Sequence, residues 1–220
     1  MLPEWEVRTG VLNGIPSFED ALNETGGFDG VHILPLMMSE GYFTETVIPS
    51  RLSANGAGGG WRQVTMHAAI GVSSAVADLA ARMACDGAAK LAITPRQVAV
   101  LLVGHGARTN ERARQTIEQH ARTLRAKRIF DRVDTAYLEE PPLLQDAMHG
   151  LTQATVAVGM FISDGLHAGE DVPALLKQAP CNAVHYTGAV GAHPAMSEII
   201  AREVVGLGCN QTVPYEHETL

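Results

Sequence analysis

The second half of the chain alternates apolar runs with amphipathic stretches. Residues 98–103 (VAVLLV) form a continuous apolar run, typical of a strand that is buried on both faces of a parallel sheet. Further strands are expected at residues 133–138, 154–162 and 183–186, with a loop at residues 163–169. Helices are expected from about residue 108, around Leu144 and Met148, and at residues 170–178 and 194–205. This order predicts an α/β fold with a doubly wound parallel sheet.

The first half repeats part of this layout. Three segments match in the same order at nearly constant spacing: residues 7–16 (VRTGVLNGIP) with 133–142 (VDTAYLEEPP), residues 39–42 (SEGY) with 163–166 (SDGL), and residues 64–79 with 184–199. Such self-similarity predicts two similar doubly wound parallel-sheet lobes from an internal duplication. We expect a degenerate N-terminal lobe at residues 1–94 and a C-terminal lobe at residues 95–220 that carries the metal site.

The first copy starts at the segment that corresponds to the second strand of the repeated unit. Its expected elements are a strand at residues 6–12, a loop at 54–60, a helix at 68–84 and a linker at 86–97. The first strand and helix of the unit are missing, which leaves a sheet edge to be covered. Either residues 206–220 or a second subunit would cover that edge, so a homodimer is one expectation.

Composition narrows the function classes. The chain has 220 residues and a net charge of −8, which argues against a general nucleic-acid binder. No apolar run is long enough to span a membrane, and the first ten residues lack the pattern of a signal peptide. The cysteines Cys85, Cys181 and Cys209 are odd in number and far apart, which suits reduced thiols and a cytoplasmic location.

Polar side chains follow successive predicted strands of the second copy. His105 follows the first strand, Glu139 the second, and His167 stands in the loop after the third. The first copy has Asn13 where Glu139 stands and Phe43 where His167 stands. The carboxyl ends of parallel strands share one edge, so these groups should meet there. Two imidazoles and a carboxylate can bind a divalent transition metal and accept protons near neutral pH.

The other histidines carry weaker signals. His193 lies after the fourth strand where the first copy has Ser73, and it is equally compatible with a helix start. His120 and His149 fall within predicted helices and are interpreted as structural. The remaining histidines lack a supporting pattern: His32, His67, His185 and His217.

Four motifs occur in order along the second copy: VLLVGHGAR, AYLEEPPLLQDAM, FISDGLHAGEDVP and GAVGAHP. Together they resemble the CbiX-type sirohydrochlorin chelatases, class II chelatases that insert a metal ion into a tetrapyrrole without an ATP-driven motor. The resemblance covers almost all of residues 98–205 and, more weakly, residues 7–79. It implies a bilobal α/β fold that binds the macrocycle in the cleft between the lobes.

The resemblance also implies a site. His105 and His167 match the family's histidines and Glu139 its acid, so these three are the expected catalytic and metal-binding residues. The family's usual HGSR is HGAR here, with Ala107 in place of the serine. Gly159 replaces a proline that Pro35 keeps in the first copy.

Metal insertion requires the loss of two pyrrole protons and the exchange of metal-bound water for ring nitrogens. His105 and His167 would hold Co²⁺ or Fe²⁺ and take up protons, while Glu139 completes the ligand set or relays protons outward. The donor set suits Co²⁺, Fe²⁺ and Ni²⁺ alike, and no nucleotide is needed. Cobalt is the favoured metal substrate.

Binding of the tetrapyrrole calls for further groups. Gly104 and Gly106 let the backbone approach a flat ligand, and Arg108 and Arg112 could pair with its carboxylates. The other basic residues before Arg128 are interpreted as a solvated helix face. Apolar cover for the ring, or ordinary core, would come from five residues of the first copy: Leu36, Met37, Met38, Tyr42 and Phe43.

Two other functions stay open at this point. A degenerate first lobe is compatible with a non-catalytic metal or tetrapyrrole carrier. A different small-molecule enzyme on the same sheet is the second alternative, because a fold alone does not fix a function.

Overall fold

The computed structural model describes residues 5–26, 28, 30–55, 63–107, 111–180 and 183–207. By its contacts the chain divides into two units. Unit 1 comprises Met1–Pro35, Glu40–Ala69 and Ile200–Leu220, and unit 2 comprises Leu36–Ser39 and Ile70–Ile199. This division differs from the boundary expected at residue 94. No helix among the described residues is long and apolar enough to cross a membrane.

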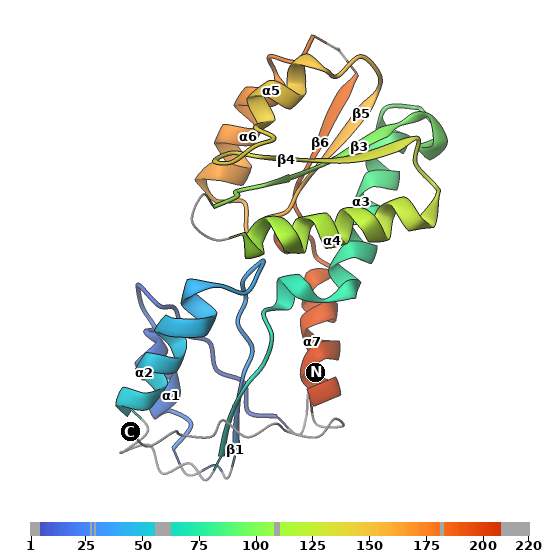
Figure 1. The fold of residues 1–220 in the computed structure, drawn as a ribbon. Coiled ribbons are helices and arrows are strands. Elements are labelled where there is room, and N and C mark those ends of the chain that lie inside the picture. The colour runs from blue at the N-terminus through green and yellow to red at the C-terminus, as the bar shows by residue number, and fades with distance from the viewer. Residues whose placement is uncertain are drawn as a thin grey trace. The chain divides into compact units, whose positions relative to one another are not determined.

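Unit 2 contains a four-stranded parallel sheet (Figure 1). Its strands are β3 (Ala99–Gly104), β4 (Arg132–Tyr137), β5 (Thr155–Gly159) and β6 (Val184–Ala189). They lie in the order β4-β3-β5-β6, so β3 is a central strand, and every residue of β3 is buried. The predicted α/β fold with a parallel sheet is confirmed, although β5 ends earlier and β6 later than expected.

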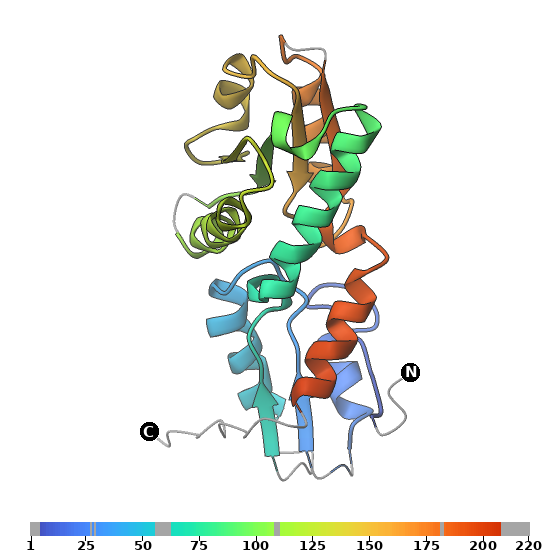
Figure 2. The ribbon, with the colours of Figure 1, turned by 90° about the vertical axis from the view of Figure 1, so that its right-hand side faces the viewer.

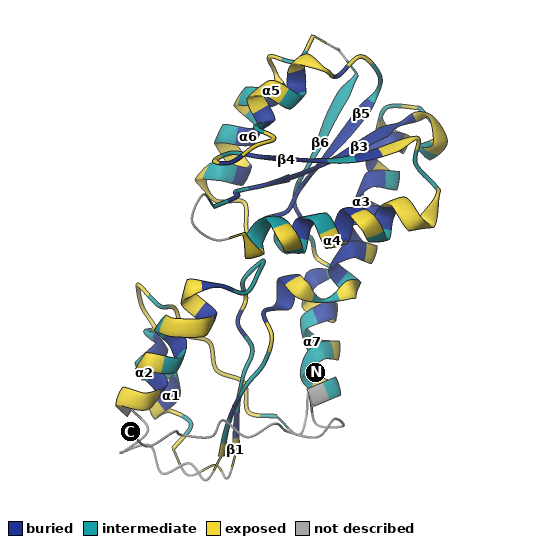
Figure 3. Cartoon of the chain, viewed as in Figure 1, coloured by how far each residue is buried: buried dark blue, intermediate teal, exposed yellow. Residues whose placement is uncertain are grey.

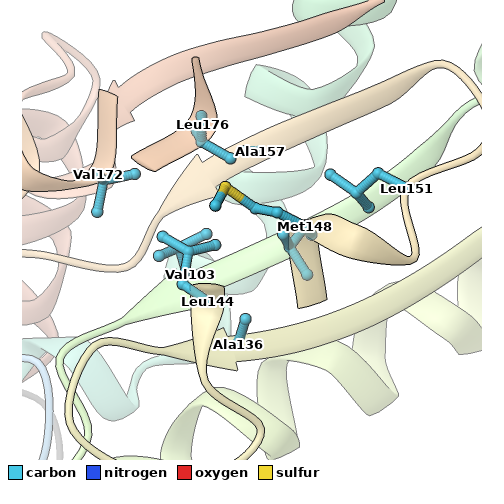
Figure 4. Packing of buried hydrophobic residues seen from close by; sticks show 9 residues of the cluster. Val103, Ala136, Leu144, Met148, Leu151, Ala157, Val172 and Leu176 are labelled. Atoms are coloured by element: carbon cyan, nitrogen blue, oxygen red, sulfur yellow. The ribbon is translucent and has the colours of Figure 1, made fainter. Parts of the chain in front are cut away.

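Helices cover both faces of this sheet. Helices α5 (Leu144–His149) and α6 (Val172–Leu176) pack on one face, where Leu101 and Val103 of β3 point into a shared apolar cluster (Figure 4). Helices α3 (Ser74–Lys90) and α4 (Arg112–Lys127) pack on the other; Figure 2 views α4 nearly along its axis. The sheet is therefore doubly wound. In Figure 3 the buried residues concentrate on β3, β4 and β5 and on the inner sides of α3 and α4.

Helix α3 closes the first repeat in sequence but packs within unit 2. Gly87 lets it approach β5 closely, because a Cβ there would lie 2.6 Å from the Cγ1 atom of Val156. The expected start at residue 68 is wrong by about two turns: a 3-10 turn, Ile70–Val72, comes first, and the Ser73 hydroxyl caps α3 by accepting the Ala75 N–H at 3.2 Å. The expected linker is also helical as far as Lys90.

A hydrogen bond from a buried histidine links helix α4 to the 3-10 turn that precedes α3. The Nε2 atom of His120 lies 2.7 Å from the carbonyl oxygen of Gly71, so the imidazole N–H donates to it. Burial lowers the pKa of His120, which favours the neutral ring that this bond requires. The structural role predicted for His120 is confirmed.

Unit 1 is smaller in regular structure. Its described strands are β1 (Gly30–Ile33) and β2 (Gln63–Met66), which pair in parallel, and its helices include α1 (Phe18–Asn23) and α2 (Ile48–Asn55). Part of α7 (Met196–Leu207) belongs to it as well. The strand expected at residues 6–12 is wrong: the side chains of this segment are mostly exposed, and Val11 forms only an isolated bridge with Ser17. Its apolar side chains have no sheet face to cover.

Local structure recurs at matched positions of the two repeats. The π-helices η1 (Phe43–Val47) and η4 (His167–Asp171) lead into α2 and α6, so the second half of the expected loop at 163–169 is helical. Two further features recur: the N–H bonds of Gly71 to Met37 and Gly191 to Phe161, both 2.9 Å, and the isolated bridges Val11–Ser17 and Tyr137–Leu143. These recurrences support the duplication, which stays an inference.

Gly159 has a packing reason to replace the expected proline. A Cβ atom at this position would overlap the hydroxyl of Tyr186 and lie 2.9 Å from the carbonyl oxygen of Gly188. The Tyr186 hydroxyl is buried and has no hydrogen-bond partner among the described residues. The strand end is therefore shaped around an aromatic ring on β6.

We predict that Gly159→Ala lowers the free energy of unfolding by about 1–3 kcal/mol, the usual effect of overpacking. Tyr186→Phe should be neutral or stabilising, because it removes a buried hydroxyl without a partner. Gly159→Ala should cost less in the Tyr186→Phe background, which urea unfolding of the four proteins would measure. Strictly additive effects would show that the two positions are not coupled.

Candidate metal site

The candidate site lies where the order of the strands reverses. The chain passes from β3 to β4 on one side and then crosses to β5 on the other side of β3. In doubly wound sheets the carboxyl ends at such a switch point are the usual place of ligand binding. His105 follows β3 directly, and His167 begins the π-helix after β5. Glu139 follows β4, the other neighbour of β3.

The turn that carries His105 is fixed by packing. Gly106 has a φ of +77°, and a Cβ there would lie 2.8 Å from the Cγ atom of Glu140. A Cβ on Gly104 would overlap the side chain of Ile117 on α4. The fold therefore requires both glycines, and their predicted role in ligand approach stays a prediction.

Two adjacent acids after the end of β4, Glu139 and Glu140, make different contacts. The carboxylate of Glu140, which is only 8% exposed, accepts the N–H of Ala107 at 3.0 Å and lies 3.7 Å from Nε of Arg114. This contact holds the backbone of the turn formed by Gly104, His105 and Gly106. Glu139 is exposed instead, and its Oε1 atom lies 3.7 Å from Nε2 of His105. Glu139 was the acid predicted from the sequence, whereas the role of Glu140 emerges only from the structure.

The imidazoles of His105 and His167 meet through their Nε2 atoms, which are 3.2 Å apart. Each ring is held at its other nitrogen. Nδ1 of His105 lies 2.9 Å from the carbonyl oxygen of Gly106, and Nδ1 of His167 lies 2.8 Å from Oδ2 of Asp171. Carbonyl and carboxylate oxygens only accept hydrogen bonds, so both Nδ1 atoms carry protons.

This arrangement leaves two lone pairs facing each other. A neutral imidazole that is protonated at Nδ1 has an unprotonated Nε2 atom. His105 and His167 therefore cannot hydrogen-bond to each other while both are neutral. Their contact is stable only with a cation between the rings, which is either a proton or a metal ion.

The spacing of the two nitrogens fits a metal ion. Nitrogen ligands lie about 2.0–2.1 Å from Zn²⁺, so two that share such an ion at angles of about 90–110° are about 2.8–3.4 Å apart. The observed 3.2 Å lies in this range. Glu139 stands slightly farther out, and no three His, Cys, Asp or Glu side chains among the described residues form a complete site. The geometry thus offers two nitrogen ligands, with the Glu139 carboxylate 3.7 Å from one of them.

Comparison with known proteins identifies the family of the chain. The CbiX family model matches residues 1–86 and 99–206. The chain belongs to the CbiX family. A protein of Halobacterium salinarum named probable sirohydrochlorin cobaltochelatase is 27% identical over 92% of this chain and 80% of its own length.

Two solved structures share the CbiX fold. The first is CbiX, described as the terminal enzyme for biosynthesis of siroheme in denitrifying bacteria; it has a TM-score of 0.73 and 22% identity, over 84% of this chain and 78% of its own. The second is the sirohydrochlorin chelatase SirB from Bacillus subtilis subspecies spizizenii in complex with cobalt. It has a TM-score of 0.67 and 15% identity, over 93% of this chain and 82% of its own.

The departure from the CbiX motif at Ala107 leaves the turn intact. Its contact with Glu140 is made by the backbone N–H, which every residue other than proline provides. The loss of the serine hydroxyl therefore does not release the segment that positions His105.

The other predicted residues take different places. Arg108 lies outside the described residues, and Arg112 is an exposed residue at the start of α4. His193 uses its Nδ1 atom to accept the N–H of Ala195 at 3.1 Å, the local capping role that was the alternative to a site role. Exposure argues against a core role for three of the five apolar residues: Leu36, Tyr42 and Phe43 are 46%, 64% and 48% exposed.

A second histidine pair, in unit 1, was missed by the sequence analysis. Nδ1 of His32 lies 2.8 Å from Nε2 of His67, with the rings stacked and Trp5 against His32. No acceptor holds the outer nitrogens of this pair in the described structure, so one ring can donate directly to the other. The pair is stable without a cation and offers an internal control.

We predict that Co²⁺ binds at His105 and His167 in the absence of tetrapyrrole. His105→Ala and His167→Ala should each weaken binding by at least about tenfold, because each removes a nitrogen ligand. His67→Ala should leave the affinity unchanged. Titration followed by calorimetry and visible absorption would measure it, and equal affinities in all four proteins would contradict the assignment.

Proposed function

We propose that this chain inserts a divalent metal ion into sirohydrochlorin, with Co²⁺ as the favoured metal and Fe²⁺ next. The observation that carries the proposal is the pair of imidazole lone pairs that converge at the switch point. Membership of the CbiX family and the relative named a cobaltochelatase support the choice of reaction and metal. No bound nucleotide is required by this chemistry.

His105 and His167 account for both halves of the reaction. Their Nε2 atoms hold the metal ion until the pyrrole nitrogens replace them as ligands. The same two lone pairs, once vacated, accept the two pyrrole protons. Two imidazoles thus match two protons, with one bond to the metal broken at each histidine and one N–H bond formed.

The positive charge that this step leaves on the two imidazoles can pass to a neighbouring carboxylate as protons. Two imidazolium rings with Nε2 atoms 3.2 Å apart repel each other, and transfer of a proton to a neighbouring group would relieve this repulsion. Glu139 is exposed, and its carboxylate lies 3.7 Å from Nε2 of His105, so it can accept a proton from this ring. We assign it the role of proton relay, with metal coordination as a second role if its side chain rotates inward.

The tetrapyrrole needs binding groups of its own. Arg112 is exposed at the start of α4 and can pair with peripheral carboxylates, as Arg108 is expected to do. Tyr42 and Phe43 form an exposed aromatic pair with centroids 5.6 Å apart, suited to cover an apolar ring. The cytoplasmic location, the homodimer and the lack of nucleic-acid and membrane partners stay predictions.

We predict more than one turnover per protein when sirohydrochlorin and Co²⁺ are mixed with the chain, followed by the absorbance of the metallated product. His167→Ala should lower kcat by about 10²-fold or more, the contribution of a positioned acid–base group. Its stability should change by less than about 1 kcal/mol, because the ring is partly exposed.

Phe43→Ala is the matched comparison at the equivalent position of the first repeat. It should raise KM for the tetrapyrrole and leave Co²⁺ binding intact. Stoichiometric uptake without turnover in the unchanged protein would favour the carrier alternative. Insertion at the parental rate by His167→Ala would remove the assignment of this residue.

A further inference from the structure

Asp171 shares a π-helix with His167 and touches its outer nitrogen. The carboxylate Oδ2 atom lies 2.8 Å from Nδ1 of His167, four residues earlier in the chain. We propose that Asp171 is a positioning residue that keeps His167 protonated at Nδ1 and turns its Nε2 lone pair toward His105. The inference deepens the proposed function, on which its catalytic meaning rests.

The backbone of η4 brings the two side chains together. The N–H of Val172 donates to the carbonyl oxygen of His167, the i+5 bond of a π-helix. Residues four apart then lie on the same side of the helix, where an acid and an imidazole can meet. Asp171 needs no long-range contact to reach its partner.

Comparison of the two repeats shows which features of η4 belong to its backbone and which to the candidate metal site. The π-helix η1 has the same internal bond, from Ile48 N–H to Phe43 O, but Phe43 and Val47 stand where His167 and Asp171 stand in η4. The imidazole and the carboxylate are therefore replaced together. The backbone forms without the carboxylate, so Asp171 is not needed to build this turn.

A neighbouring acid behaves in the opposite way. Oδ1 of Asp164 accepts the N–H of Ala189 at 2.9 Å, and in the first repeat Oε1 of Glu40 accepts the N–H of Ala69 at 2.6 Å. This contact is present whether or not a histidine follows. Asp164 thus belongs to the scaffold, whereas Asp171 accompanies the histidine.

A purely stabilising ion pair is a poor explanation for Asp171. The side chains of His167 and Asp171 are 45% and 46% exposed, and pairs in contact with water contribute little to folding. The effect of the carboxylate on the ring is directional instead. An acceptor at Nδ1 fixes the tautomer and raises the basicity of the nitrogen that binds a metal.

Replacement of Asp171 by asparagine tests this role. The amide N–H of Asp171→Asn can donate to Nδ1, which places the ring proton on Nε2. That N–H would then point at the lone pair of His105 and close the space for a metal ion. Glu170→Gln removes the same charge from an exposed position of the same π-helix and serves as the control.

The tautomer is measured directly by ¹⁵N–¹H NMR of the histidine rings, and Co²⁺ affinity by titration without tetrapyrrole. We expect His167 to be protonated at Nδ1 in the unchanged protein and in Glu170→Gln, and at Nε2 in Asp171→Asn. Co²⁺ affinity should fall by about 10- to 100-fold in Asp171→Asn and be partly restored in Asp171→Glu.

A proton that stays on Nδ1 of His167 in Asp171→Asn, or an unchanged Co²⁺ affinity, would overturn the proposal. An equal loss of affinity in Glu170→Gln would also overturn it, because net charge alone would then explain the effect. Neither readout uses sirohydrochlorin. If the tautomer and affinity change as expected but the unchanged protein does not metallate the ring, the proposed function fails while the role of Asp171 stands.

Discussion

The structure of the site depends on one constraint: two imidazoles are held so that their Nε2 atoms face each other. The acceptors at Gly106 and Asp171 fix the outer nitrogens of His105 and His167, which prevents a direct hydrogen bond between the rings. A proton or a metal ion shared by the two Nε2 atoms, which are 3.2 Å apart, would satisfy both of them. The pair in unit 1, His32 and His67, lacks this constraint.

The parallel sheet positions the residues of the site relative to one another. Adjacent parallel strands bring the ends of β3 and β5 to one edge, and β4 brings Glu139 to the other side of His105. Glu140 and Asp164 then fix the two loops through backbone N–H groups. His105 and His167 therefore lie on loops whose backbones are held in place. This limits the reorganisation that metal transfer would need. The first repeat keeps the π-helix and, through Glu40, the backbone contact that Asp164 makes, but it has Phe43 and Val47 in place of His167 and Asp171.

Much of this was predictable from the sequence. The apolar run after residue 97 and the histidines at strand ends predicted the parallel sheet and the pair of His105 and His167. The strand expected at residues 6–12 was wrong. It was inferred from the match to residues 133–142, where β4 pairs with β3, but the first repeat lacks the first strand of the unit. Asp171 and Glu140 were missed, since an acid four residues after a histidine and one beside another acid look like surface residues. The pairing of His32 with His67 depends on strand register, which the sequence does not reveal.

The central claim is that a metal ion occupies the space between the Nε2 atoms of His105 and His167. A crystal structure of the protein with Co²⁺, with data collected at the cobalt absorption edge, tests it most directly. The account predicts an anomalous peak about 2.1 Å from both Nε2 atoms, with the Nδ1 atoms still bonded to Gly106 and Asp171. A peak elsewhere, or two histidines hydrogen-bonded to each other with no metal between them, would contradict it.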